Sequence, residues 1–170
     1  ALLAIRTEQS AEDVRALYAD YPEFMPQYVE QCLGVASEDT AYLIDALPLF
    51  VHDTLYGFDK TNTTVQTTFA DMHGIQQELT HAFTRIHYLY PDLYIPKIYT
   101  FVSGFNASIL FLDEGDMAVG LDMYLGSDYP YYNQVVYNYQ KQTMRKECIA
   151  GDVVSGYLFA TFPYEGTKSR

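Results

Sequence analysis

The stretch 96–126 constrains the fold more than any other part of the chain, because it contains the clearest strand patterns and a hairpin turn. Two short apolar runs, residues 107–112 and 117–121, flank the sequence Asp-Glu-Gly-Asp, which is typical of turns. We therefore predict a β-hairpin over residues 107–121. The β-branched and aromatic residues at 98–102 predict another strand just before it.

A tight corner is expected between the first strand and the hairpin, at residues 103–106 (SGFN). Gly104 and Asn106 are the two residue types that most readily adopt positive φ, so we assign the turn to them. The hairpin strands are apolar on both faces instead of alternating. We therefore expect other elements of the protein, namely helices, to cover the sheet on both sides.

Helical patterns occupy the rest of the chain. Apolar residues recur at helical spacing before the hairpin, most regularly over residues 75–86. After it, we predict a tyrosine-rich helix at residues 131–142, and either a helix or a buried strand at 149–161. Helices, a small antiparallel sheet and helices again define a predominantly helical α+β fold. The length of 170 residues fits one domain.

Charge and composition exclude some classes of function. The formal net charge is −12, whereas nucleic-acid-binding proteins display a basic face, so we expect no nucleic-acid partner. No segment of the sequence is apolar for long enough to span a bilayer. Cys32 and Cys148 are compatible with one disulfide or with two buried thiols.

Motifs for known chemistry are absent from the sequence. It contains no H-E-x-x-H, no G-x-S-x-G, no glycine-rich phosphate loop and no C-x-x-C. Glu78 and His81 are three residues apart on an expected helix, a spacing that lets two side chains share a metal ion, but one such pair is weak evidence for a metal site. His81 also lies on the polar face of that helix, which favours exposure to solvent. The acidic turn at Asp113, Glu114 and Asp116 is expected to be a solvated hairpin tip. We predict no catalytic residues, no metal site and no cofactor.

Asp122 is the most unusual residue of the stretch, since an ionised carboxylate in an apolar run is costly unless it is paired or hydrogen-bonded. We expect its partner to be backbone N–H groups, Arg85 or Lys97. One interpretation is structural: Asp122 anchors the corner at residues 103–106. The other is functional, with a polar binding recess formed by Ser103, Asn106, Asp122 and Tyr124.

Tyrosine is abundant, with 17 residues, and tryptophan is absent. Tyrosine offers both apolar area and a polar tip, which suits recognition of peptides or sugars. A second candidate site is therefore an aromatic binding surface at Tyr129, Tyr131 and Tyr132. The alternative is that these rings serve helix packing.

Several segments resemble the gliding-motility-associated lipoprotein GldB family of Bacteroidota. The most specific is VGLDMYLG at 119–126, with SGFN at 103–106 and DYPYY at 128–132 beside it. Tyr21-Pro22, Phe24, Pro26 and Cys32-Leu33-Gly34 are similar to the opening helix of the family, and FPYEGTKSR at 162–170 is similar to its next segment. The resemblance covers nearly the whole chain.

The resemblance implies a non-enzymatic envelope lipoprotein, accessory to gliding motility and protein secretion, whose biochemical activity the family does not define. It implies other envelope proteins as partners and a membrane-anchored position facing the periplasm, through a lipid anchor absent from this chain. It also implies that residues 1–170 are one GldB-like domain, the N-terminal portion of a longer protein.

Two alternatives stay open. The first is a degenerate, distantly zincin-like metallopeptidase relative, in which the helix at 131–142 would be the metal-binding helix. That segment contains neither histidine nor glutamate, so the zinc ligands and the general base would be missing. The second is a tyrosine-rich module that binds peptides or carbohydrates.

Overall fold

The computed structural model describes residues 5, 7–36, 39–54 and 57–163. The segment 164–170, part of the family resemblance, lies outside the described residues. The fold is α+β, as predicted, with several helices on either side of a small sheet. The longer helices are α1 (Ser10–Asp20), α2 (Phe24–Tyr28) with its extension Val29–Leu33, α3 (Thr40–His52), α4 (Phe58–Thr68), α5 (His73–Leu89) and α7 (Ile149–Thr161).

The sheet has strand order β1-β3-β2, with β1 at Ile98–Phe101, β2 at Ile109–Phe111 and β3 at Met117–Gly120. Strands β2 and β3 form the predicted antiparallel hairpin, in which Leu110 lies opposite Ala118. Strand β1 pairs with the other side of β3, and this pairing is parallel. The sheet is thus mixed and not purely antiparallel, because the chain turns back after β1 and β3 then runs in the same direction as β1.

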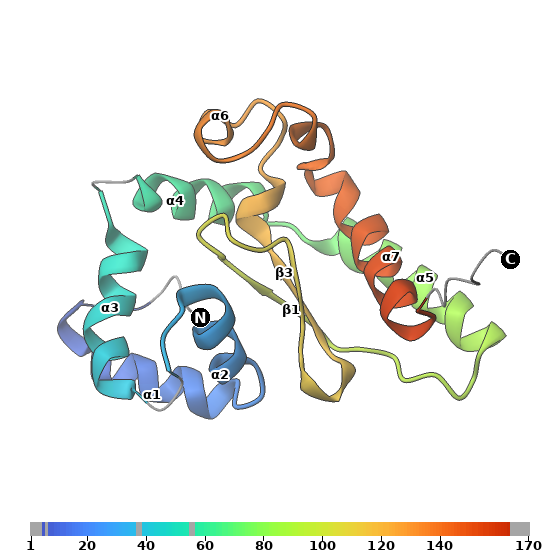
Figure 1. Cartoon of the computed structure of the whole chain (residues 1–170), viewed down its shortest axis with the longest axis horizontal. Helices are drawn as coiled ribbons and strands as arrows, with labels where there is room; N and C mark the ends of the chain where they lie inside the picture. Colours follow the sequence, from blue (N-terminus) through green and yellow to red (C-terminus); the bar gives the residue numbers. More distant parts are fainter. Residues whose placement is uncertain (1–4, 6, 37–38, 55–56, 164–170) are drawn as a thin grey trace, which may run out of the picture.

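Helices cover both faces of the sheet, as the apolar hairpin strands predict. In Figure 1, α1, α2 and α3 lie on one side of β1 and β3, and α5 and α7 lie on the other. Two buried clusters result, and β3 supplies both of them. Ala118 packs in the first, whereas Met117 and Val119 pack in the second with Val153 of α7. The alternation along β3 follows the two-residue period of a strand.

The segment after the sheet differs from the prediction. The prediction of one helix over 131–142 is wrong. Only α6 (Tyr132–Val135) is α-helical, and a 3-10 turn follows at Gln140–Thr143. Val136 is extended, and the side chain of Gln140 accepts a hydrogen bond from the backbone of Tyr137. Asn and β-branched residues are poor helix formers, which explains the interruption. Residues 149–161, for which a helix or a strand was possible, form α7.

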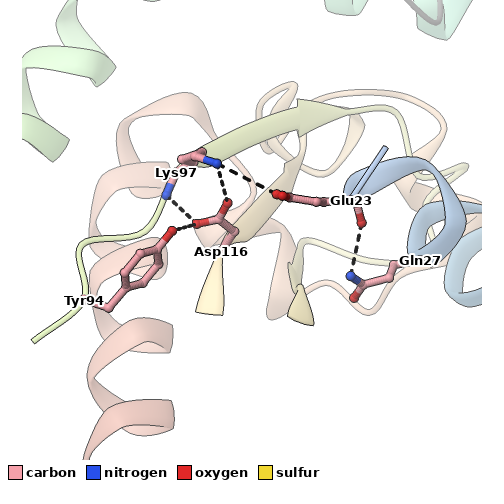
Figure 2. Close-up of polar contacts among 5 residues, drawn as sticks. All are labelled: Glu23, Gln27, Tyr94, Lys97 and Asp116. Carbon is pink, nitrogen blue, oxygen red and sulfur yellow. Dashed lines mark hydrogen bonds and ion pairs between the residues drawn. The ribbon is translucent and has the colours of Figure 1, made fainter. Parts of the chain in front are cut away.

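The acidic turn of the hairpin is only partly the solvated tip that we expected, since Asp116 is buried with 3% of its surface exposed. Its carboxylate accepts hydrogen bonds from the Tyr94 hydroxyl (2.6 Å) and from the backbone N–H of Lys97 (2.8 Å). Figure 2 shows the Lys97 ammonium reaching both Asp116 (3.9 Å) and Glu23 (3.8 Å). This network ties the hairpin turn to the start of β1 and to α2.

Candidate functional site

Asp122 lies in the 3-10 turn Leu121–Tyr124 directly after β3, and none of its surface is exposed. Its carboxylate accepts hydrogen bonds from the backbone N–H of Ser103 (2.8 Å), the Ser103 hydroxyl (3.0 Å) and the backbone N–H of Phe105 (2.7 Å). The structural interpretation is therefore correct: Asp122 anchors the corner after β1. Of the expected partners, the backbone N–H groups are confirmed, whereas Lys97 pairs with Asp116 instead.

The corner at residues 103–106 is also tied to the helices on the first face of the sheet. The Asn106 amide donates to the carbonyl of Cys32 (3.2 Å), and the Tyr28 hydroxyl donates to the carbonyl of Val102 (3.0 Å). Positive φ occurs at Gly104, as we predicted, and at Phe105, whereas we had expected it at Asn106. Phe105 takes this conformation where its N–H donates to Asp122.

Burial dominates the electrostatics around this corner. It raises the pKa of Asp122, although the hydrogen bonds from Ser103 and Phe105 oppose the rise. It also raises the pKa of the Cys32 thiol to about 11, with a contribution from the negative charge of Asp122. The pKa of Tyr28 lies well above its ordinary value for the same reasons. The corner thus surrounds one buried carboxyl group with neutral hydrogen-bonding groups.

Tyr124, the fourth residue of the predicted recess, points elsewhere. Its hydroxyl donates to Asp152 of α7 at 3.0 Å, and burial raises its pKa. Tyr124 and Asp152 line a separate cavity of about 170 Å³, together with Ser108. The structure therefore brings Ser103, Asn106 and Asp122 together and places the Tyr124 hydroxyl in a different pocket. Asp152 has no local sequence pattern that connects it to Tyr124, 28 positions away.

The rings of the second candidate site gather around Phe105. The Phe105 ring stacks on Tyr131, with centroids 4.8 Å apart, and on Tyr129 and Phe58, each 6.3 Å away. We call Phe58, Phe105, Tyr129 and Tyr131 the aromatic cluster. All four side chains are partly exposed. Sequence analysis missed Phe58 and Phe105, because residues from α4, the corner and the segment after β3 meet only in the folded chain.

Tyr132 connects the two candidate sites from inside the protein. Its side chain is fully buried and lies edge-on to Phe105. Its hydroxyl donates to the backbone carbonyl of Asp122 (2.7 Å) and accepts from the N–H of Leu125 (2.9 Å). Tyr132 is consequently part of the support beneath the aromatic cluster and not part of an exposed surface.

The fold and the site together define an α+β domain in which a buried carboxylate orders the backbone beneath a partly exposed aromatic cluster. Within the described ranges, no group of three or more His, Cys, Asp or Glu side chains is placed to hold a metal ion. None of the described helices combines the length and apolar character that a membrane crossing requires.

Comparison with known families assigns this chain to a family. The chain belongs to the family described as gliding motility protein GldB, whose match covers residues 1–170, and it is thereby a gliding-motility-associated lipoprotein by family. The match includes both VGLDMYLG, which contains Asp122, and the corner that Asp122 anchors. No curated protein and no solved structure matches the chain.

Proposed function

We propose that the protein is a non-enzymatic accessory of the gliding motility and protein-secretion machinery in the cell envelope of Bacteroidota. A lipid anchor holds it to the membrane, facing the periplasm, and it acts by binding another envelope protein. Membership of the GldB family supports the role in gliding motility and the attachment through a lipid anchor. The aromatic cluster is the proposed contact surface.

The observation that carries this proposal is the partial exposure of the aromatic cluster over a fixed backbone. Aromatic residues are enriched in protein interfaces, and a ring held rigidly before binding loses little entropy when a partner docks. Ser103 and Asp122, by contrast, are fully buried and hydrogen-bonded to each other. Their burial favours a supporting role over direct contact with a substrate.

The proposal can be tested with a photo-crosslinking amino acid at position 131 of the protein in living, gliding cells. We expect a specific crosslink between position 131 and an envelope protein. The matched control is Tyr137, which is 73% exposed and stacks only on Tyr139 among the described aromatic residues. Crosslinking at position 137 and not at 131 would reject the aromatic cluster as the contact surface.

A genetic experiment tests the process itself. We expect Tyr131→Ala to reduce colony spreading and secretion while the protein remains in the membrane fraction at its normal level. Tyr137→Ala should leave both unchanged. Normal spreading with Tyr131→Ala would reject the aromatic cluster as the contact surface. Normal spreading after deletion of the whole gene would reject the role of the protein in motility.

A further inference from the structure

Strand β1 presents a free edge. In its parallel pairing with β3, the N–H of Met117 donates to the carbonyl of Lys97 (3.1 Å), and Ile98 lies opposite Met117. This register directs the backbone polar groups of Tyr99 toward β3 and those of Ile98 and Thr100 to the opposite side. In the part of the chain that the structure describes, no strand pairs with β1 on that side. Thr100 is exposed.

A groove of about 390 Å³ lies beside this free edge. Leu79, Phe83, Thr84 and His87 of α5 line one wall, and Ile95 and Ile98 lie on the strand side. α7 packs against β3, so the sheet face near β1 is less covered than the centre, and Ile98 is only partly buried. An apolar surface therefore adjoins the outward backbone groups of Ile98 and Thr100, which pair with no strand in the described ranges.

The chemistry of the groove restricts what can occupy it. The chain has 22 acidic residues, yet none of the residues that line the groove is acidic. An extended peptide would satisfy the backbone groups of Ile98 and Thr100, and every second side chain of that peptide would face the groove. Apolar side chains at those positions match the lining.

The strand side of the groove is fixed before any ligand binds. Asp116 accepts hydrogen bonds from both Tyr94 and Lys97, the residues that bracket Ile95 and Pro96 (Figure 2). The Tyr157 hydroxyl of α7 also donates to the carbonyl of Tyr94 at 2.6 Å. A preformed wall lowers the entropy cost of binding.

We propose that the outer edge of β1 and the adjoining groove bind an extended, apolar segment of a partner protein as an additional β-strand. This surface contains no residue of the aromatic cluster, so the proposal goes beyond the function proposed above and does not depend on it.

The test uses a displayed library of nine-residue peptides, selected on the whole chain, and measures affinity by fluorescence anisotropy. We expect selected peptides to carry apolar residues at alternate positions. Thr100→Pro removes the outward N–H, which an edge strand tolerates, and should weaken binding by about tenfold or more. Thr100→Val keeps the N–H and should preserve affinity. Equal binding by both variants, or no selected peptide, would overturn the proposal.

A second pair of variants tests the groove. Thr84→Trp fills it and should abolish binding, whereas His81→Trp, on the exposed part of α5, should not. Sedimentation velocity distinguishes another occupant. If the unaltered chain forms a dimer that Thr100→Pro dissociates, a second copy occupies the edge, and a partner segment is ruled out. Circular dichroism of each variant confirms that the fold is retained.

Discussion

The carboxylate of Asp122 accepts a hydrogen bond from the backbone N–H of Phe105 at 2.7 Å, and Phe105 has a φ of 63°. This left-handed conformation costs a residue with a side chain about 1–2 kcal/mol. A hydrogen bond to a charged group contributes about 1.5–3 kcal/mol, which is enough to offset that cost. Asp122 therefore determines where the Phe105 ring lies, and the ring is the centre of the aromatic cluster.

The pH dependence of stability should report the burial of Asp122. Because its pKa is raised in the folded state, the folded protein binds more protons than the unfolded chain at pH values above 3.8. The stability that wild type gains from Asp122 should therefore increase as the pH falls from about 7 toward 3.8 and be lost as the pH rises. Urea denaturation across this range measures the free energy of unfolding of wild type minus that of Asp122→Asn, and a value that falls as the pH is lowered would contradict a raised pKa.

The hydroxyl of Tyr132 should contribute to stability through its two hydrogen bonds, to the carbonyl of Asp122 and from the N–H of Leu125. Tyr132→Phe leaves the buried carbonyl of Asp122 and the part-buried N–H of Leu125 without this partner. We expect a loss of about 2 kcal/mol in the free energy of unfolding. Tyr137→Phe is the control, since Tyr137 is exposed, and it should change stability very little. Equal effects of the two substitutions would show that the Tyr132 hydrogen bonds contribute nothing.

Gly120 should tolerate no side chain. A Cβ atom at this position would collide with the backbone carbonyl oxygen of Ala107. Since that atom is backbone, relief requires movement of β3 or of the segment before β2, and we expect Gly120→Ala to destabilise the fold by about 3 kcal/mol. Gly151 of α7 has no atom near its would-be Cβ, so Gly151→Ala should stabilise by about 1 kcal/mol. Thermal denaturation measures both, and a neutral Gly120→Ala would place Ala107 elsewhere.

The two cysteines are both free, and they should differ in reactivity. Cys32 is buried and burial raises its pKa to about 11, whereas Cys148 is partly exposed. Because the thiolate is the reactive form, a thiol reagent should modify Cys148 quickly and Cys32 only on unfolding. Cys148→Ser should abolish the fast phase, and Cys32→Ser should leave it. Rapid modification of Cys32 in the folded protein would contradict its burial.

The sequence was informative where local pattern decides structure. Two apolar runs around an acidic turn predicted the hairpin and its coverage on both faces, and the isolated Asp122 predicted a buried, hydrogen-bonded carboxylate. Relationships between distant segments could not be predicted. Neither the parallel pairing of β1 with β3 nor the contact of Phe58 with Phe105 has a local pattern, because each forms only when the chain folds.

Besides the helix expected at 131–142, two local predictions failed because of contacts that form only in the folded chain. Asn106 has the higher propensity for positive φ, but the hydrogen bond from its neighbour to Asp122 places that conformation at Phe105. The acidic residues at 113–116 are typical of a solvated turn, yet Asp116 is buried and accepts hydrogen bonds from Tyr94 and Lys97. In both cases a tertiary hydrogen bond outweighs the preference of the individual residue.

The most direct test of the role of Asp122 is amide hydrogen exchange of Phe105, followed by NMR in wild type and Asp122→Ala. We expect slow exchange in wild type, and exchange accelerated by about a hundredfold in the variant, as the loss of roughly 3 kcal/mol from a buried charged acceptor implies. The amide of Gly120, bonded to the carbonyl of Ser108, is the internal reference. If the Phe105 amide exchanges at the same rate in both proteins, or accelerates no more than that of Gly120, Asp122 does not hold the corner.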